Sequence, residues 1–121
     1  MLACPDFSEI FRLQVDASDQ DLGAVLIQKI FGQDWIIAYA SSSLAEPQKI
    51  YATFEKECLA IVWGIQKIRP YFEGYRFTVE MDHQSLKWLL RQSNPRGRLA
   101  RWITSLQPYD FEVVYRKGVL N

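Results

Sequence analysis

The sequence predicts a single α/β domain in which helices pack on a mixed sheet of about five strands. The order of the patterns is the first observation: three strand-like segments come first, followed by a helix, a strand, two helices and a last strand. The second is size, because 121 residues with 49% apolar and 14% aromatic side chains suffice for one hydrophobic core. We therefore expect one domain over residues 1–121.

The chain opens with segments that are typical of an antiparallel meander. Residues 10–16, 21–31 and 35–40 have strand-like composition. Turn-forming residues at 18–21 and 31–34 separate them. These connections are short enough to join antiparallel neighbours, so three consecutive strands should lie side by side.

A long helix is predicted next, beginning at Pro47 and ending before Pro70 and Gly74. Its apolar residues recur at spacings of three and four and should face the sheet; they are Tyr51, Phe54, Cys58, Ile61, Ile65 and Ile68. The charged residues off this stripe should face solvent; they are Lys49, Glu55, Lys56 and Lys67.

The second half of the chain alternates between strands and helices. We expect a strand over 75–82, a short helix near 84–92, a helix over about 98–107 and a last strand over 111–116. The turn residues at 94–97 separate the two helices. With the meander, these elements complete a mixed five-stranded sheet covered by helices.

Three carboxylates stand where such a fold would bring side chains together. Asp16 ends the first strand, Glu57 lies within the long helix, and Asp82 ends the fourth strand. Asp16 and Asp82 become neighbours if their strands pair, and Glu57 flanks the apolar stripe of the helix. Mg²⁺ and Mn²⁺ prefer several oxygen ligands, and pairs of such ions about 3.5–4 Å apart are a common device for phosphodiester hydrolysis. The three acids are therefore candidate catalytic metal ligands.

Each acid also has an ordinary structural interpretation when it is taken alone. Asp16 can close an Asx turn with the residues after it. Glu57 can be a solvated helix residue or one partner of an i,i+4 pair. Asp82 can cap the helix that begins near residue 84. Of their neighbours, His83 receives no role, and Cys58 lies on the apolar stripe and is interpreted as a buried thiol.

Charge is unevenly distributed although the formal net charge is zero. Residues up to Asp82 hold 7 basic and 12 acidic side chains, whereas residues from His83 onward hold 7 basic and 2 acidic ones. The basic candidates for contacts with nucleic-acid phosphates are Lys87, Arg96, Arg98 and Arg101, and a plain solvated surface is the open alternative. Trp88 and Trp102 occupy helical apolar positions, which favours core packing over base stacking.

Several functional classes lack their sequence signals. Two cysteines do not make a disulfide framework, so we expect a reduced intracellular protein. We see neither a signal peptide nor an apolar run of membrane-spanning length, so we expect a soluble protein with no membrane partner. The absence of a glycine-rich phosphate loop disfavours a nucleotide-binding ATPase.

Ordered motifs along nearly the whole chain resemble the ribonuclease H domain of gypsy-type LTR retrotransposon reverse transcriptases. The motifs lie at residues 11–28, 39–44, 51–62, 77–90, 98–102 and 109–118, with Asn121 after them. The central ones read Val-Asp-Ala-Ser at 15–18, Glu-Lys-Glu-Cys-Leu-Ala-Ile-Val at 55–62 and Asp-His-Gln-Ser-Leu-Lys-Trp-Leu-Leu at 82–90.

The resemblance implies a ribonuclease H-like fold and metal-dependent endonucleolytic cleavage of the RNA strand of RNA/DNA hybrids. In the family pattern, Asp16, Glu57 and Asp82 are the catalytic residues and the ligands of Mg²⁺ or Mn²⁺ in a two-metal site. Glu57 is chosen over Glu55 because the family's glutamate precedes the Leu-Ala-Ile core segment in this register. The implied partners are the hybrid and the polymerase portion of a larger Pol polyprotein.

One departure from the family pattern concerns a fourth acid. The family carries another metal-ligating Asp a few residues beyond the position of Asn121, so the chain is expected to be truncated before the last helix. We expect weakened metal affinity and low or no activity of this chain alone. The alternative function is a non-catalytic or degenerate retroelement-derived module that binds nucleic acid or serves a structural purpose.

Overall fold

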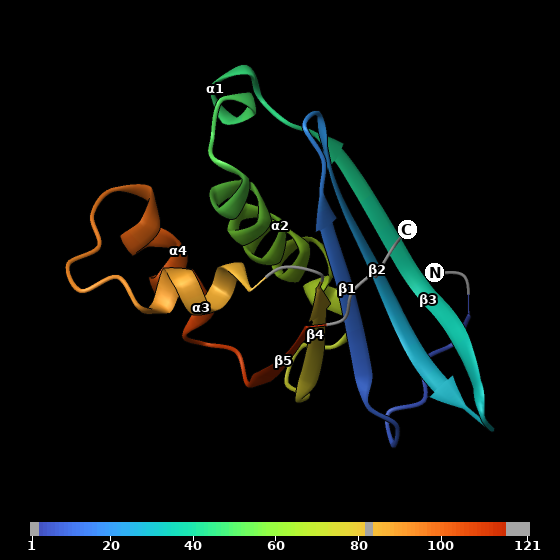
Figure 1. The fold of residues 1–121 in the computed structure, drawn as a ribbon. Helices are drawn as coiled ribbons and strands as arrows, with labels where there is room; N and C mark the ends of the chain where they lie inside the picture. Colours follow the sequence, from blue (N-terminus) through green and yellow to red (C-terminus); the bar gives the residue numbers. More distant parts are fainter. Residues whose placement is uncertain (1–2, 82–83, 116–121) are drawn as a thin grey trace.

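A computed structural model describes residues 3–81 and 84–115. It opens with the predicted meander (Figure 1), formed by β1 Phe11–Ala17, β2 Asp21–Ile30 and β3 Gln33–Ser43. β2 pairs antiparallel with β1 on one side and with β3 on the other. β3 is longer than the predicted segment because its pairing with β2 continues through the three serines that end it.

Two further strands extend the sheet next to β1. β4 Phe77–Met81 runs parallel to β1, and β5 Phe111–Tyr115 runs parallel to β4. The strand order is β3-β2-β1-β4-β5. The mixed five-stranded sheet is therefore confirmed, and so is the pairing of β1, which carries Asp16, with β4, which precedes Asp82 in the sequence.

The predicted long helix is wrong at its start, because two helices occupy the segment. α1 Glu46–Lys49 is a single turn, and α2 Thr53–Ile68 begins after Ala52, whose backbone is extended at φ −60° and ψ 156°. The break leaves Ile50 on the surface. Propensity and spacing alone did not reveal it, since the apolar positions continue across it. A 3₁₀ turn at Arg69–Tyr71 follows α2, and α3 Ser85–Leu90 and α4 Arg98–Leu106 complete the described helices.

The helices gather on one face of the sheet (Figure 1). Alternate strand residues face them and form the core, among them Leu13 and Val15 of β1 and Val79 of β4. α2 approaches the sheet closely at Gly64, where an added Cβ would lie 2.9 Å from the Val15 side chain. No helix in the part of the chain that the structure describes is long and apolar enough to cross a membrane.

Two side chains of α2 depart from the predicted division between core and solvent. Phe54, assigned to the apolar stripe, is 49% exposed, because it lies in the first turn of a helix that begins later than predicted. Lys56, assigned to solvent, is only 8% exposed, and its Nζ lies 3.8 Å from a carboxylate oxygen of Asp19. The start of α2 therefore packs against the turn between β1 and β2.

Candidate functional site

Asp16 lies near the end of β1 with its side chain on the sheet face opposite the helices. Its neighbours Val15 and Leu13 alternate with it and are buried under α2. One carboxylate oxygen of Asp16 accepts a 2.9 Å hydrogen bond from the backbone N–H of Ala17. The following turn is closed by Ser18, whose Oγ accepts a 3.0 Å hydrogen bond from the backbone N–H of Asp21. Asp16 is thus not the residue that closes the 18–21 turn.

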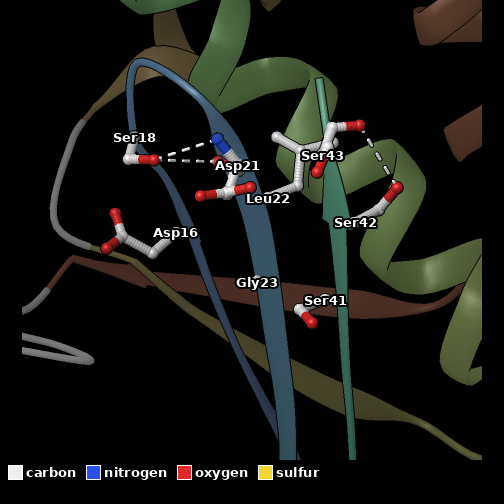
Figure 2. A pocket seen from close by; sticks show the side chains of 8 residues that line it. All are labelled: Asp16, Ser18, Asp21, Leu22, Gly23, Ser41, Ser42 and Ser43. Carbon is white, nitrogen blue, oxygen red and sulfur yellow. Dashed lines mark hydrogen bonds between the residues drawn. The ribbon is translucent and has the colours of Figure 1, made fainter. Parts of the chain in front are cut away.

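A pocket of about 570 Å³ opens beside Asp16. Figure 2 shows Asp16 and Ser41 on either side of Gly23, with the other lining side chains above them. An added Cβ at Gly23 would meet nothing within 4 Å, so the absent side chain helps to keep this pocket open. The lining is rich in hydroxyl and carboxylate groups and consists of Asp16, Ser18, Asp21, Leu22, Gly23, Ser41, Ser42 and Ser43.

Glu57 lies in the second turn of α2 and is only 2% exposed. The residue before it, Lys56, reaches Asp19 in the turn after β1. The residue after it, Cys58, donates its S–H to the Ser85 carbonyl oxygen at 3.3 Å, at the start of α3. Asp19 and Ser85 each lie three residues beyond a predicted ligand, namely Asp16 and Asp82. Glu57 is therefore held between the two segments that follow those aspartates.

Helix geometry places Glu57 on the sheet-facing side of α2. Glu57 precedes Gly64 by seven residues, which is about 20° short of two full helical turns and about 10.5 Å along the axis. Gly64 is packed against Val15, the residue before Asp16. The start of α2 contacts the turn after β1. Glu57, which is nearer to that start than Gly64, therefore lies toward the end of β1 that carries Asp16.

Glu55, the other acid of the motif, is directed elsewhere. Its Oε2 accepts hydrogen bonds from Nε and Nη2 of Arg98 in α4, the first at 2.8 Å. The Arg98 guanidinium also lies 4.1 Å from the ring centroid of Tyr51. Glu55 therefore joins α2 to α4, while Glu57 points into the interior between α2 and the sheet.

Asp82, with its neighbour His83, lies outside the described residues. The last pair in the β1–β4 register is Gln14 with Glu80, each two residues before its predicted aspartate. Within residues 3–81 and 84–115, no group of three His, Cys, Asp or Glu side chains is arranged to hold a metal ion. The predicted three-acid site stays a prediction.

The four predicted phosphate-binding cations differ in their surroundings. Arg96 and Arg101 are exposed and have no ion pair among the described residues. Lys87 is exposed on α3, with Nζ 5.6 Å from the ring centroid of Tyr115. Arg98 is already bound to Glu55. Arg96, Arg101 and Lys87 are therefore available to a ligand, whereas Arg98 first has to leave its carboxylate partner.

The two tryptophans also differ. Trp102 is 8% exposed and belongs to the core, as predicted. Trp88 is half-buried and stacks on Phe54, with 5.8 Å between ring centroids and an interplanar angle of 16°.

Cys58 is a buried thiol that stays protonated. It is 1% exposed, and its pKa is raised from 9.0 to about 12, chiefly because burial penalises the thiolate and further because Glu57 and Glu55 repel negative charge. A protonated thiol is neither a nucleophile nor a metal ligand. The interpretation of Cys58 as a structural residue is confirmed by its burial.

An ion cluster that the sequence did not reveal lies two residues before the predicted site. Glu80, 1% exposed, accepts hydrogen bonds from Arg12 Nε and Nη2 at 3.0 and 3.1 Å and from Gln14 Nε2 at 2.8 Å. Hydrogen bonding to Glu80 raises the pKa of Arg12, so the guanidinium stays charged. The available signal was the alternation of polar residues on two strands expected to pair, which placed Arg12, Gln14 and Glu80 on one face.

Sequence comparison identifies relatives over the whole chain. Residues 6–109 match the RNase H-like domain found in reverse transcriptase. The Drosophila melanogaster Pol polyproteins of the transposons opus and 412 are 41% and 42% identical over all of this chain. The chain spans only 12% and 10% of the lengths of these polyproteins.

Solved structures show the same fold. A foamy viral protease-reverse transcriptase in complex with an RNA/DNA hybrid superposes with a TM-score of 0.74 at 20% identity, covering 96% of this chain and 16% of that one. The ribonuclease LC11-RNase H1, also in complex with an RNA/DNA hybrid, gives a TM-score of 0.59 at 9% identity, covering 91% and 86%. The fold is therefore that of ribonuclease H, and the chain belongs to the family of RNase H-like domains of reverse transcriptases.

Proposed function

We propose that the chain is a metal-dependent ribonuclease H that hydrolyses the RNA strand of RNA/DNA hybrids. The observation that carries this proposal is the placement of Glu57. Its two chain neighbours contact the segments that follow Asp16 and Asp82, at Asp19 and Ser85. Such bracketing supports a shared site at the end of the sheet, where Glu57 on the helix-covered side and Asp16 on the opposite face both lie close to the ends of β1 and β4.

Asp16, Glu57 and Asp82 would hold divalent cations in this site. Cys58 beside Glu57 is buried and bonded to the Ser85 carbonyl oxygen, and the three acids offer carboxylate oxygens, which fit Mg²⁺ or Mn²⁺. When two such ions are bound, they supply an activated water molecule and stabilise the leaving oxygen of the phosphodiester. Burial on the sheet-facing side of α2 would hold Glu57 in place, and the paired strand β1 would hold Asp16.

The substrate strand would approach Asp16 from the open pocket. Hydroxyl groups at Ser18 and Ser41–Ser43 can exchange hydrogen bonds with sugar hydroxyls, which distinguish RNA from DNA. Lys87, Arg96 and Arg101 are exposed cations that can contact backbone phosphates. Two relatives of known fold were solved with an RNA/DNA hybrid, which supports the choice of substrate.

The activity would belong to a larger protein. The relatives opus and 412 are Pol polyproteins of which this chain spans about a tenth, so the polymerase portion of such a polyprotein is the proposed partner. In that setting the ribonuclease would remove RNA from the hybrid that a reverse transcriptase makes.

A strand-cleavage assay tests this function. We expect a labelled RNA strand to be cut in an RNA/DNA hybrid when Mg²⁺ or Mn²⁺ is added, and double-stranded DNA and RNA to stay intact. Asp16→Asn should abolish both cleavage and Mn²⁺ binding. Asp21→Asn is the matched control for Mn²⁺ binding, because it removes a carboxylate from the same pocket without touching a proposed ligand.

The opposite result would favour the non-catalytic alternative. Hybrid binding that does not depend on metal, with no cleavage at any Mn²⁺ concentration and no effect of Asp16→Asn, would indicate a module that holds nucleic acid without cutting it.

A further inference from the structure

Glu80 is a buried carboxylate on the sheet face that the described helices leave uncovered. Its neighbours in β4, Val79 and Met81, face the helices and are fully buried, so the side chain of Glu80 points to the opposite face. It is nevertheless 1% exposed. A buried ionised carboxylate is costly unless charged and polar donors compensate for the lost water.

The donors that compensate Glu80 come from β1. Arg12 binds both carboxylate oxygens, through Nε at 3.0 Å and Nη2 at 3.1 Å, and Gln14 adds a bond of 2.8 Å. Arg12 also extends Nη1 to Asp34 at the start of β3, at 2.9 Å. Asp34 is 52% exposed, so Glu80 is the stronger of the two partners.

These contacts match the observed alignment of β1 and β4. In the observed register, Arg12 is paired with Thr78 and Gln14 with Glu80. A slip of one residue would turn Arg12 and Gln14 toward the helix-covered core. A slip of two residues in one direction would set Asp16 against Glu80, carboxylate against carboxylate. Buried polar contacts of this kind specify strand register because the alternatives leave them unsatisfied.

The cluster lies immediately before the proposed ligands. In the sequence, Asp16 follows Gln14 by two residues and Asp82 follows Glu80 by two. Within β1, Gln14 and Asp16 share a face at a spacing of roughly 6–7 Å. We propose that Arg12, Gln14 and Glu80 are positioning residues that lock β1 to β4 in register and thereby set the separation of Asp16 and Asp82. This inference rests on the proposed metal site and adds to it residues that touch neither metal nor substrate.

The test separates positioning from simple stabilisation. Arg12→Met leaves a buried carboxylate without its main partner and should lower both stability and Mn²⁺ affinity. The double variant Arg12→Met with Glu80→Met removes both charges, and such replacements of a buried ion pair are often neutral or stabilising. We expect its thermal midpoint to return to the wild-type value while Mn²⁺ affinity, measured by electron paramagnetic resonance, stays about 10- to 100-fold weaker, the usual effect of losing support behind metal ligands.

A second ion pair, which joins the residue before β4 to β5, provides the matched control. Arg76 Nη2 lies 2.5 Å from Glu112 Oε1 of β5, but both side chains are more than half exposed. The double variant Arg76→Met with Glu112→Met should leave Mn²⁺ affinity unchanged. Arg12→Lys provides an independent measurement, because it retains the charge and loses the two-pronged bond; we expect near-wild-type stability with weakened Mn²⁺ binding.

The outcomes distinguish the two proposals. Wild-type Mn²⁺ affinity in a stable Arg12→Met/Glu80→Met variant would overturn the positioning role alone, and so would wild-type affinity in Arg12→Lys if the double variant does not fold. Absence of any Asp16-dependent Mn²⁺ binding in the wild-type chain would overturn the metal site and the positioning role together.

Discussion

This chain has an acidic side, with Asp16 and Glu57, and a basic side, with Lys87, Arg96 and Arg101. The two sides differ in how firmly the fold holds their side chains. Glu57 is buried between α2 and the sheet, and Asp16 projects from a strand paired on both sides. Lys87 is instead exposed on α3, Arg96 in the turn between α3 and α4, and Arg101 on α4. Metal ligands need fixed separations, whereas phosphate contacts tolerate adjustment, so the fold is rigid where the proposed chemistry requires it.

The largest effect should come from two glutamates that lie two residues apart. We expect Glu57→Gln to lower hybrid cleavage by about 100-fold or more, because even residues that only support metal ligands are worth about 10- to 100-fold. Glu55→Gln weakens the bond to Arg98 and should cost at most about 1 kcal/mol of stability while changing the rate only a few-fold. Single-turnover cleavage and urea unfolding of both variants measure the difference. Equal losses of cleavage rate in the two variants would mean that Glu55 and Glu57 do not have the different roles proposed for them.

Gly64→Ala tests whether close packing of α2 holds the acidic side in place. The added Cβ would lie 2.9 Å from Val15 and 3.3 Å from Ala24. Overpacking of this kind typically costs about 1–3 kcal/mol, partly offset by about 1 kcal/mol of improved helix propensity. We expect a net loss of stability and reduced cleavage, since α2 must move away from β1.

Gly23→Ala is the control for that experiment. Its Cβ would meet nothing within 4 Å, so the stability should change little. A stable, fully active Gly64→Ala variant would show that α2 and β1 adjust more readily than their contact suggests.

The basic side should show a smaller and salt-dependent effect. Replacing Arg96, Arg101 or Lys87 singly by Met should reduce the slope of log affinity against log salt by about 1 for each lost phosphate contact. Arg98→Met should change the slope less, because its guanidinium is already paired with Glu55. Hybrid binding measured between low and moderate salt gives the slopes. An unchanged slope in all variants would indicate a plain solvated surface.

Sequence patterns predicted the layers of this fold well because they reflect burial. The alternation in β1 and the helical spacing of Cys58, Ile61 and Ile65 both report which side chains face the core. The break before Thr53 was missed because Tyr51 and Phe54 continue the apolar spacing across it. Local backbone geometry, here the extended Ala52, interrupts a helix without interrupting its pattern.

The candidate site differs in how much of it the sequence and the structure each provide. The motifs name Asp16, Glu57 and Asp82 as candidate ligands, which stays a prediction, and the structure adds that Glu55 is bonded to Arg98 whereas Glu57 is buried. The bond between Arg98 and Glu55 spans 43 positions, and the one between Arg12 and Glu80 spans 68. Such pairs depend on which surfaces the tertiary fold brings together, which periodicity along one segment does not encode.

The smallest effect concerns the thiol that adjoins Glu57 and reports on the same buried region. Cys4 is exposed, whereas Cys58 is buried with its pKa raised to about 12 by desolvation. At pH 8 only about one Cys58 in 10,000 is a thiolate, so a thiol reagent should label Cys4 promptly and Cys58 only after unfolding. In the unfolded chain the thiol loses its proton near its ordinary pKa of 9.0, whereas the folded chain retains the proton up to about pH 12. The free energy of unfolding should therefore fall as pH rises from about 9 toward 12, and Cys58→Ala should flatten that decline. Prompt labelling of both thiols in the folded chain would mean that the interior beside Glu57 opens readily, and would remove the contrast between a fixed acidic side and an adaptable basic one.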